Sequence, residues 1–193
     1  MSEPINEVAM LEAALEQGLQ LRRAGAADGA LEMLDLIVSH FEAADHPAAH
    51  LAVSRALLGR AMALCDLSRE PEALETLDGL LQRIRGQDDA AYRELRIIAA
   101  YEAAELLAGQ NDPESAAEGL AFAIGQAQGD EPAKVVHILA AAHVKLAEAR
   151  QALGDTDGAR AALAAVAGQW GASSDPALKH WVEEAARLAG ELG

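Results

Sequence analysis

The chain has 193 residues, of which 51% are hydrophobic, 24% are charged and only 3% are aromatic. It contains 46 Ala and 27 Leu but only 8 Val and 7 Ile. Because strands favour β-branched and aromatic residues, this composition nearly excludes a β-sandwich, a β-barrel or a parallel sheet. The net charge of −16 makes nucleic acid and anionic membrane surfaces unfavourable partners.

The single cysteine, Cys65, excludes a disulfide within the chain and is typical of a reducing compartment. The residues after Met1 lack the basic and apolar regions of a signal peptide. No uninterrupted apolar run approaches the length of about 18 residues that a membrane-spanning helix needs. We therefore expect a cytoplasmic protein without a membrane span.

The sequence predicts four helix pairs followed by one unpaired helix. The first helices of the pairs are expected near residues 4–24, 47–67, 90–109 and 133–153. The second helices are expected near residues 28–43, 71–85, 113–128 and 157–170. The ninth helix, near 176–192, begins where a fifth pair would begin, and it covers the last apolar face of a helical stack.

A spacing of 43 residues relates the four pairs. An Ala opens the apolar part of each second helix, and a Leu follows it four residues later; these residues are Ala30, Ala73, Ala116 and Ala159, and Leu34, Leu77, Leu120 and Leu163. A turn residue stands five residues before each Ala, at Gly25, Ser68, Asn111 and Gly154. Gly and Asn tolerate the left-handed backbone that ends a helix. A small residue recurs in each first helix and predicts close helix contact, at Gly18, Ala61, Ala104 and Ala147.

The helix starts follow the same spacing. Pro4, Pro47 and Pro176 occupy one repeat position, and Pro132 misses it by one residue. Pro is favoured in the first turn of a helix, where its missing N–H has no partner to lose. The repeats are therefore expected at about 4–46, 47–89, 90–132 and 133–175, with a capping helix at 176–192 and one domain over 1–193.

The segment from Leu15 to Gly25, followed by Ala30 to Leu34, resembles the tetratricopeptide repeat (TPR), and so does the segment from Gly154 to Leu163. That family has a small residue in helix one, Gly or Asn in the turn, and Ala followed by a large apolar residue in helix two. The unit here is longer than the usual unit of about 34 residues, and it resembles the long units of kinesin light chains and bacterial signal-transduction proteins. The resemblance implies an all-α, right-handed α-solenoid of four TPR-like helix pairs plus a C-terminal capping helix.

The resemblance also implies that the first helices line a groove for a peptide, a helix or a partner domain. The residues expected to contact a partner are Leu15, Leu19, Arg22, Arg55, Leu58, Met62, Tyr101, Glu105, Val144 and Glu148. This set changes from apolar with Arg to acidic along the chain, which suits a segment with one apolar anchor and a basic end. The alternative is that Leu15, Leu19, Leu58 and Met62 are core residues between long helices.

No sequence motif points to catalysis or to a cofactor. The chain lacks GxGxxG, GxxxxGK[ST], GxSxG, HExxH and paired CxxC patterns. His46 and His50 are four residues apart, as in some Zn²⁺ sites. Because Pro47 begins the helix, His46 lies at its cap and can point elsewhere, so we expect no metal site there.

These observations favour a non-enzymatic adaptor or scaffold that binds a protein or peptide, with a basic segment as one candidate partner. The alternatives are a ligand- or peptide-sensing regulator, a secretion or assembly chaperone, and a self-association module that forms a homodimer. The sequence does not discriminate among these partners.

Overall fold

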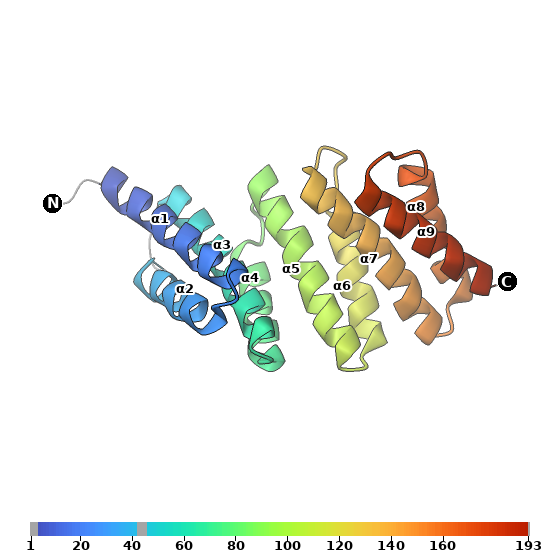
Figure 1. Ribbon diagram of the computed structural model, residues 1–193, viewed down its shortest axis with the longest axis horizontal. Coiled ribbons are helices and arrows are strands. Elements are labelled where there is room, and N and C mark those ends of the chain that lie inside the picture. The colour runs from blue at the N-terminus through green and yellow to red at the C-terminus, as the bar shows by residue number, and fades with distance from the viewer. Residues whose placement is uncertain (1–3, 42–45, 193) are drawn as a thin grey trace. The chain divides into compact units, whose positions relative to one another are not determined.

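The computed structural model describes residues 4–41 and 46–192, with side chains from residue 8 onward. All regular secondary structure in these ranges is helical (Figure 1). The helices are α1 (Pro4–Arg23), α2 (Ala27–Phe41), α3 (Pro47–Asp66), α4 (Glu70–Arg83), α5 (Ala90–Gly109), α6 (Pro113–Gly125), α7 (Ala133–Ala152), α8 (Thr156–Trp170) and α9 (Pro176–Glu191). The predicted all-α repeat fold is confirmed.

The helix bounds agree closely with the prediction, with one clear exception. Helix α6 ends at Gly125, whereas the sequence predicted an end near residue 128. The amide of Gln126 donates a hydrogen bond to the carbonyl of Ala123, and the amide of Ala127 donates one to the carbonyl of Ile124. These bonds span three residues instead of four, so the α-helix ends early. The predicted end of the first repeat's second helix at residue 43 lies outside the described residues.

The four turns between paired helices share one geometry. Their central residues have positive φ angles of 79° at Gly25, 57° at Ser68, 62° at Asn111 and 78° at Gly154. In every turn the amide of the following residue donates to the carbonyl five residues earlier, at 2.8 to 3.0 Å. This bond satisfies a carbonyl that the end of the helix leaves without a partner. The predicted turn register is therefore confirmed.

The helix starts follow the expected pattern in α3 and α9 but not in α7. Pro47 and Pro176 lie in the first turn, and the side chains of His46 and Asp175 accept hydrogen bonds from the amides of the helices that follow. Pro132 instead occupies the N-cap of α7, which has no side-chain cap. The one-residue offset of this proline places it before the helix.

The chain divides into two compact units, residues 1–95 and residues 96–193. The division falls within α5, so its first residues belong to unit 1 and the remainder to unit 2. Within unit 2, α7 contacts α6, α8 and α9. The expectation of one domain over 1–193 stays a prediction.

The positions that repeat every 43 residues form the core of both units. The four Ala residues at the start of the second helices are 0% exposed, and the Leu residues that follow them are at most 2% exposed. At Gly18, a Cβ would lie 3.1 Å from Cδ2 of the fully buried Leu34, so α1 and α2 approach closely there. Burial of this apolar register is the main favourable contribution to the fold.

Candidate protein-binding surface

The residues predicted to contact a partner fall largely on two repeat positions, and the structure separates these positions by burial. The first position holds Leu15, Leu58, Tyr101 and Val144. Leu15 is 6% exposed, Leu58 is 9% exposed and Val144 is 0% exposed. Tyr101 is half-buried. The second position holds Leu19, Met62, Glu105 and Glu148, which are all half-buried. The first position therefore contributes mainly to packing, and the second borders the surface.

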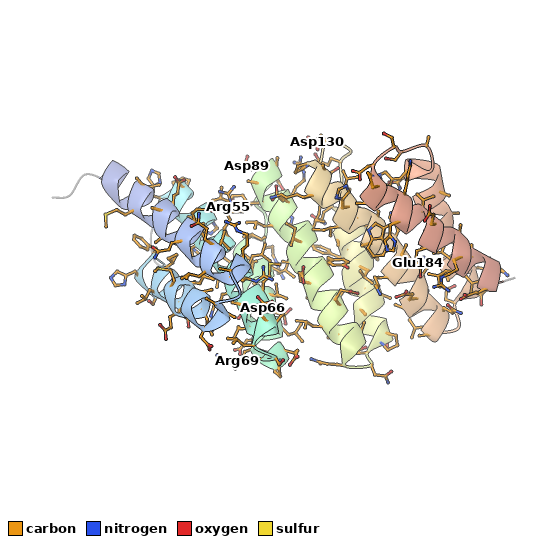
Figure 2. All side chains as sticks on the ribbon, viewed as in Figure 1. Arg55, Asp66, Arg69, Asp89, Asp130 and Glu184 are labelled. Carbon is orange, nitrogen blue, oxygen red and sulfur yellow. The ribbon has the colours of Figure 1, made fainter. Side chains whose placement is uncertain are left out.

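In unit 1 the residues at the second position, Leu19 and Met62, take part in contacts between α1 and α3. A Cβ on Gly59 would lie 2.8 Å from Cδ2 of Leu19, which shows that Leu19 packs against the backbone of α3. The guanidinium of Arg22 donates to Asp66 at 2.8 Å, and one of its nitrogens lies 3.7 Å from the sulfur of Met62. Asp66 lies at the end of α3 (Figure 2). These contacts join the two first helices.

Arg55 differs from its neighbours in unit 1 because its side chain is exposed on α3. It lies two helical turns before Met62, on the same helix. Among the other candidates in this unit, Leu15 and Leu58 are buried, and Leu19 packs on the backbone of α3. These candidate residues therefore offer a partner little exposed apolar surface.

In unit 2 the corresponding residues gather carboxylates around a tyrosine. Burial raises the pKa of Tyr101 far above its ordinary value, and the nearby Glu105, Glu102 and Glu148 raise it further. The phenol therefore stays protonated, with the carboxylate of Glu105 close to it. Tyr101 also packs against the main apolar cluster of unit 2, which contains Val144.

Two charged residues that the sequence analysis did not identify complete this surface. Nζ of Lys145 lies 2.9 Å from Oε2 of Glu148, and this hydrogen bond is the main cause that raises the pKa of Lys145. Glu105 and Glu184 raise that pKa further, so both carboxylates lie within electrostatic range of the ammonium group. Glu184 lies on α9 and accepts a hydrogen bond from Arg187 at 2.9 Å (Figure 2).

We call Glu102, Glu105, Glu148 and Glu184 the acidic cluster. The cations identified beside these four carboxylates are Lys145 and Arg187. The sequence contained one signal for it, because Glu105 and Glu148 share a repeat position. Lys145 stands three residues before Glu148 on α7, so helix geometry places these two side chains together. Glu184 has no such relation to the cluster, and only the packing of α7 with α9 brings it near.

A pocket of about 210 Å³ opens beside the acidic cluster. Its apolar lining consists of Ala108, Pro113, Leu120, Ala149 and Ala152, and its polar lining of Glu105, Asn111, Lys145 and Glu148. Leu120 and Ala149 are buried, whereas Ala108 and Ala152 are exposed. We call this the acidic pocket, since carboxylates border an apolar lining.

The histidines considered as metal ligands have separate partners. Nδ1 of His46 accepts a hydrogen bond from the amide of Ala48 at 3.2 Å and so caps α3. Nδ1 of His50 lies 2.9 Å from the hydroxyl of Tyr92. In the part of the chain that the structure describes, no three His, Cys, Asp or Glu side chains are grouped closely enough to hold a metal ion.

Comparisons with known proteins agree with the fold. No protein-family model and no curated protein matches the chain. A crystal structure described as nearly identical TPR-like repeats of a kinesin light chain from Podosopora anserina matches it with a TM-score of 0.69 and 20% sequence identity. The match covers 99% of this chain and 90% of that chain.

Among the described helices, none is both long and apolar enough to cross a lipid bilayer. The regular helix pairs, the four equivalent turns and the similarity over nearly the whole length agree on one architecture. The chain has the fold of TPR-like helical repeats.

Proposed function

We propose that this protein is a non-enzymatic interaction adaptor that binds a segment of a partner protein at the acidic pocket. The observation that carries the proposal is the apolar pocket of about 210 Å³ bordered by Glu105 and Glu148. The partner segment would place an apolar side chain in the pocket and a Lys or Arg beside it. A reducing, cytoplasmic location is part of the proposal, since the chain contains a single cysteine.

The chemistry of the pocket supports both parts of this segment. Full burial of a Leu or Val side chain contributes about 1.5–3 kcal/mol. Hydrogen bonds between a cationic side chain and a carboxylate are stronger than neutral ones. Glu105 and Glu148 are half-buried, so solvent screens them less than fully exposed carboxylates. The negative charge of the acidic cluster would also speed the encounter with a basic segment.

The fold supports a binding role independently of the pocket. Stacked helical repeats present an extended surface made of several helices, and such surfaces commonly bind proteins. Here α5, α6 and α7 all contribute residues to the acidic pocket. A partner segment would therefore contact three helices that local packing holds in place.

The proposal is tested by selecting peptides from a random display library against the full chain. We expect enrichment of sequences in which Leu, Ile or Val stands close to Lys or Arg. Affinities of the selected peptides are then measured by fluorescence anisotropy at low and high salt. Because the cationic contact is electrostatic, affinity should fall as salt rises.

Matched variants separate the pocket from the rest of the surface. Glu105→Gln combined with Glu148→Gln removes the charges, and Ala152→Leu obstructs the apolar opening. Glu118→Gln and Ala161→Leu make the same types of substitution, one residue each, at exposed sites on the second helices α6 and α8. The pocket variants should weaken binding about tenfold, a loss of about 1.4 kcal/mol, while the control variants bind as the unchanged protein does.

Equal binding by the pocket variants and the unchanged protein would contradict the proposal. Enrichment of acidic peptides would contradict its charge complementarity. Light scattering of the protein alone distinguishes this adaptor from a self-association module, because the adaptor requires no second copy of the chain.

A further inference from the structure

The repeat position at the C-terminal ends of the second helices differs in the third repeat. It holds Phe41, Ile84, Ala127 and Trp170 in the four repeats. Ile84 is 0% exposed and fills its position, whereas Ala127 is exposed. The third repeat therefore has a methyl group where the other repeats have large apolar side chains.

A pocket of about 380 Å³ lies where this side chain is small. It is lined by Ile124, Ala127, Gly129, Glu131, Val136, Leu139, His143, Gln169 and Trp170. Leu139, Ile124 and Trp170 belong to or pack on an apolar cluster with Ile97 and Val135. The volume lies within the range of about 300–1,000 Å³ that is common for small-molecule sites. No residue of this pocket belongs to the acidic pocket.

His143 is the unusual residue of the pocket. The same repeat position holds Ala14, Leu57, Ala100 and Ala186 elsewhere. His143 is only 8% exposed, and its Nδ1 is buried and makes no hydrogen bond with any residue that the structure describes. Such an atom normally has a partner, because burial without one destabilises the fold.

The surroundings of His143 favour a neutral imidazole. Burial lowers the pKa of His143, and the positive charge of Arg150 lowers it further. A neutral imidazole carries one donor and one acceptor nitrogen. No described residue forms a hydrogen bond with Nδ1, so a ligand in the pocket would supply its missing partner.

The aromatic wall of the pocket favours a flat ligand. The rings of His143 and Trp170 have centroids 5.9 Å apart and meet at 66°, in an edge-to-face arrangement. Aromatic pairs favour such offset and edge-to-face contacts, which a third ring can extend. Burial of a charged group would be costly, so an uncharged ring system fits these walls best.

Another part of the pocket lining is a loop held by local hydrogen bonds. The carboxylate of Glu131 accepts hydrogen bonds from the amides of Gln128 and Gly129. Gly129 has a φ of 92°, a conformation that favours glycine. The loop is therefore positioned by its own residues, and a ligand need not order it.

We propose that this pocket binds a small, flat, uncharged aromatic molecule with a ring N–H or hydroxyl, which hydrogen-bonds to the imidazole of His143. The aromatic body contacts Trp170 and occupies the space left by Ala127. This site is a binding function separate from the recognition of a partner protein.

The test is a titration of the isotope-labelled full chain with indole and, separately, with benzofuran, followed by amide and indole N–H NMR shifts. The two probes have nearly the same shape, but only indole has an N–H donor. We expect shifts at residues 127–131, at His143 and at Trp170. Indole should bind about fivefold more tightly than benzofuran, the ratio that one net hydrogen bond gives.

Two variants replace a pocket residue with the residue that another repeat has at the same position. A third variant is a control at an exposed site. Ala127→Ile introduces the isoleucine that the second repeat has at this position, Ile84. The larger side chain should fill the pocket and abolish binding of both probes. His143→Ala introduces the alanine that the third repeat has at the equivalent position, Ala100. This variant should retain weak binding of both probes but lose the preference for indole. Ala121→Ile makes the control change at an exposed position of α6 and should leave both affinities unchanged.

The outcomes are decisive in either direction. The proposal is overturned if indole shifts none of the pocket residues up to its solubility limit, or if Ala127→Ile binds it as the unchanged protein does. Equal preference for indole in His143→Ala would overturn the role of the imidazole. If Ala127→Ile fails to fold, the His143→Ala comparison still tests the site, because it changes a different wall.

Discussion

Ser68→Gly should stabilise the protein, because Ser68 has a left-handed backbone. Its φ is 57°, and Gly25 and Gly154 occupy the equivalent turns with φ of 79° and 78°. The Ser68 side chain is exposed, and the amide hydrogen bonds of the turn run from Ser68 and Arg69 to α3 carbonyls. The substitution therefore leaves the hydrogen bonds of the turn in place.

The size of the effect follows from two opposing contributions. A non-glycine residue in the left-handed region costs roughly 1–2 kcal/mol relative to its preferred backbone. Glycine removes this cost, but it also raises the conformational entropy of the unfolded chain. That second effect lowers the stability of the folded protein by about 0.4–1 kcal/mol. The net stabilisation expected for Ser68→Gly is about 0.5–1 kcal/mol.

Urea unfolding monitored by circular dichroism measures this difference. Gly79→Ala is the matched control, because Gly79 lies inside α4 and, apart from its own stretch of helix, nothing lies within 4 Å of the position of a new Cβ. It should stabilise by about 1 kcal/mol through helix propensity. Ser68 and Gly79 both lie in unit 1, so they affect the same transition even if the units unfold separately.

The result that refutes the reasoning is a lower urea midpoint for Ser68→Gly alongside a higher midpoint for Gly79→Ala. That pair would show that Ser68 contributes a stabilising contact larger than its backbone strain. Unchanged slopes of the unfolding curves are needed for the comparison, since a change in slope reports a change in exposed surface.

Three further changes have defined outcomes. Gly154→Ala should lower stability by about 1 kcal/mol in the same urea assay, because the turn requires a positive φ of 78°. Leu77→Ala should cost about 2–5 kcal/mol, since Leu77 is 0% exposed, while Leu36→Ala, at 59% exposed, should change stability by less than about 0.5 kcal/mol. The hydrogen bond from His137 lowers the pKa of the Asp175 carboxyl, and the amide of Ala177 assists. Its stabilisation is thus present above the ordinary carboxyl pKa and is lost as the pH falls below about 4. Asp175→Asn should make thermal stability decline less steeply in that acidic range; an equally steep decline would contradict this assignment.

The repeat register was predictable because each signal is local. The Ala and Leu at positions 30 and 34 lie four residues apart on one helical face, and helix geometry alone brings them together. The turn residues were predictable for a similar reason, since a positive φ restricts which residues are favoured there. The early end of α6 was not, because residues 126–128 contain neither Pro nor a helix-ending glycine.

The candidate binding residues were only partly predictable from repeat position. Leu15 and Leu19 are four residues apart, yet Leu15 lies in the core and Leu19 packs on Gly59 at the surface of α3. Sequence spacing identifies a common helical face but not how much of it the next helix covers. That coverage depends on the distance between helices, which small residues such as Gly59 determine.

The sequence by itself determined the nine helices of the described residues, their turns and the spacing that repeats the core. These features depend on backbone conformation and on contacts a few residues apart. Only the tertiary structure placed Lys145 near Glu184 and left a pocket between Ala127 and Trp170. Those contacts join residues about 40 positions apart in the chain, and their distances depend on how neighbouring side chains fill the space between helices.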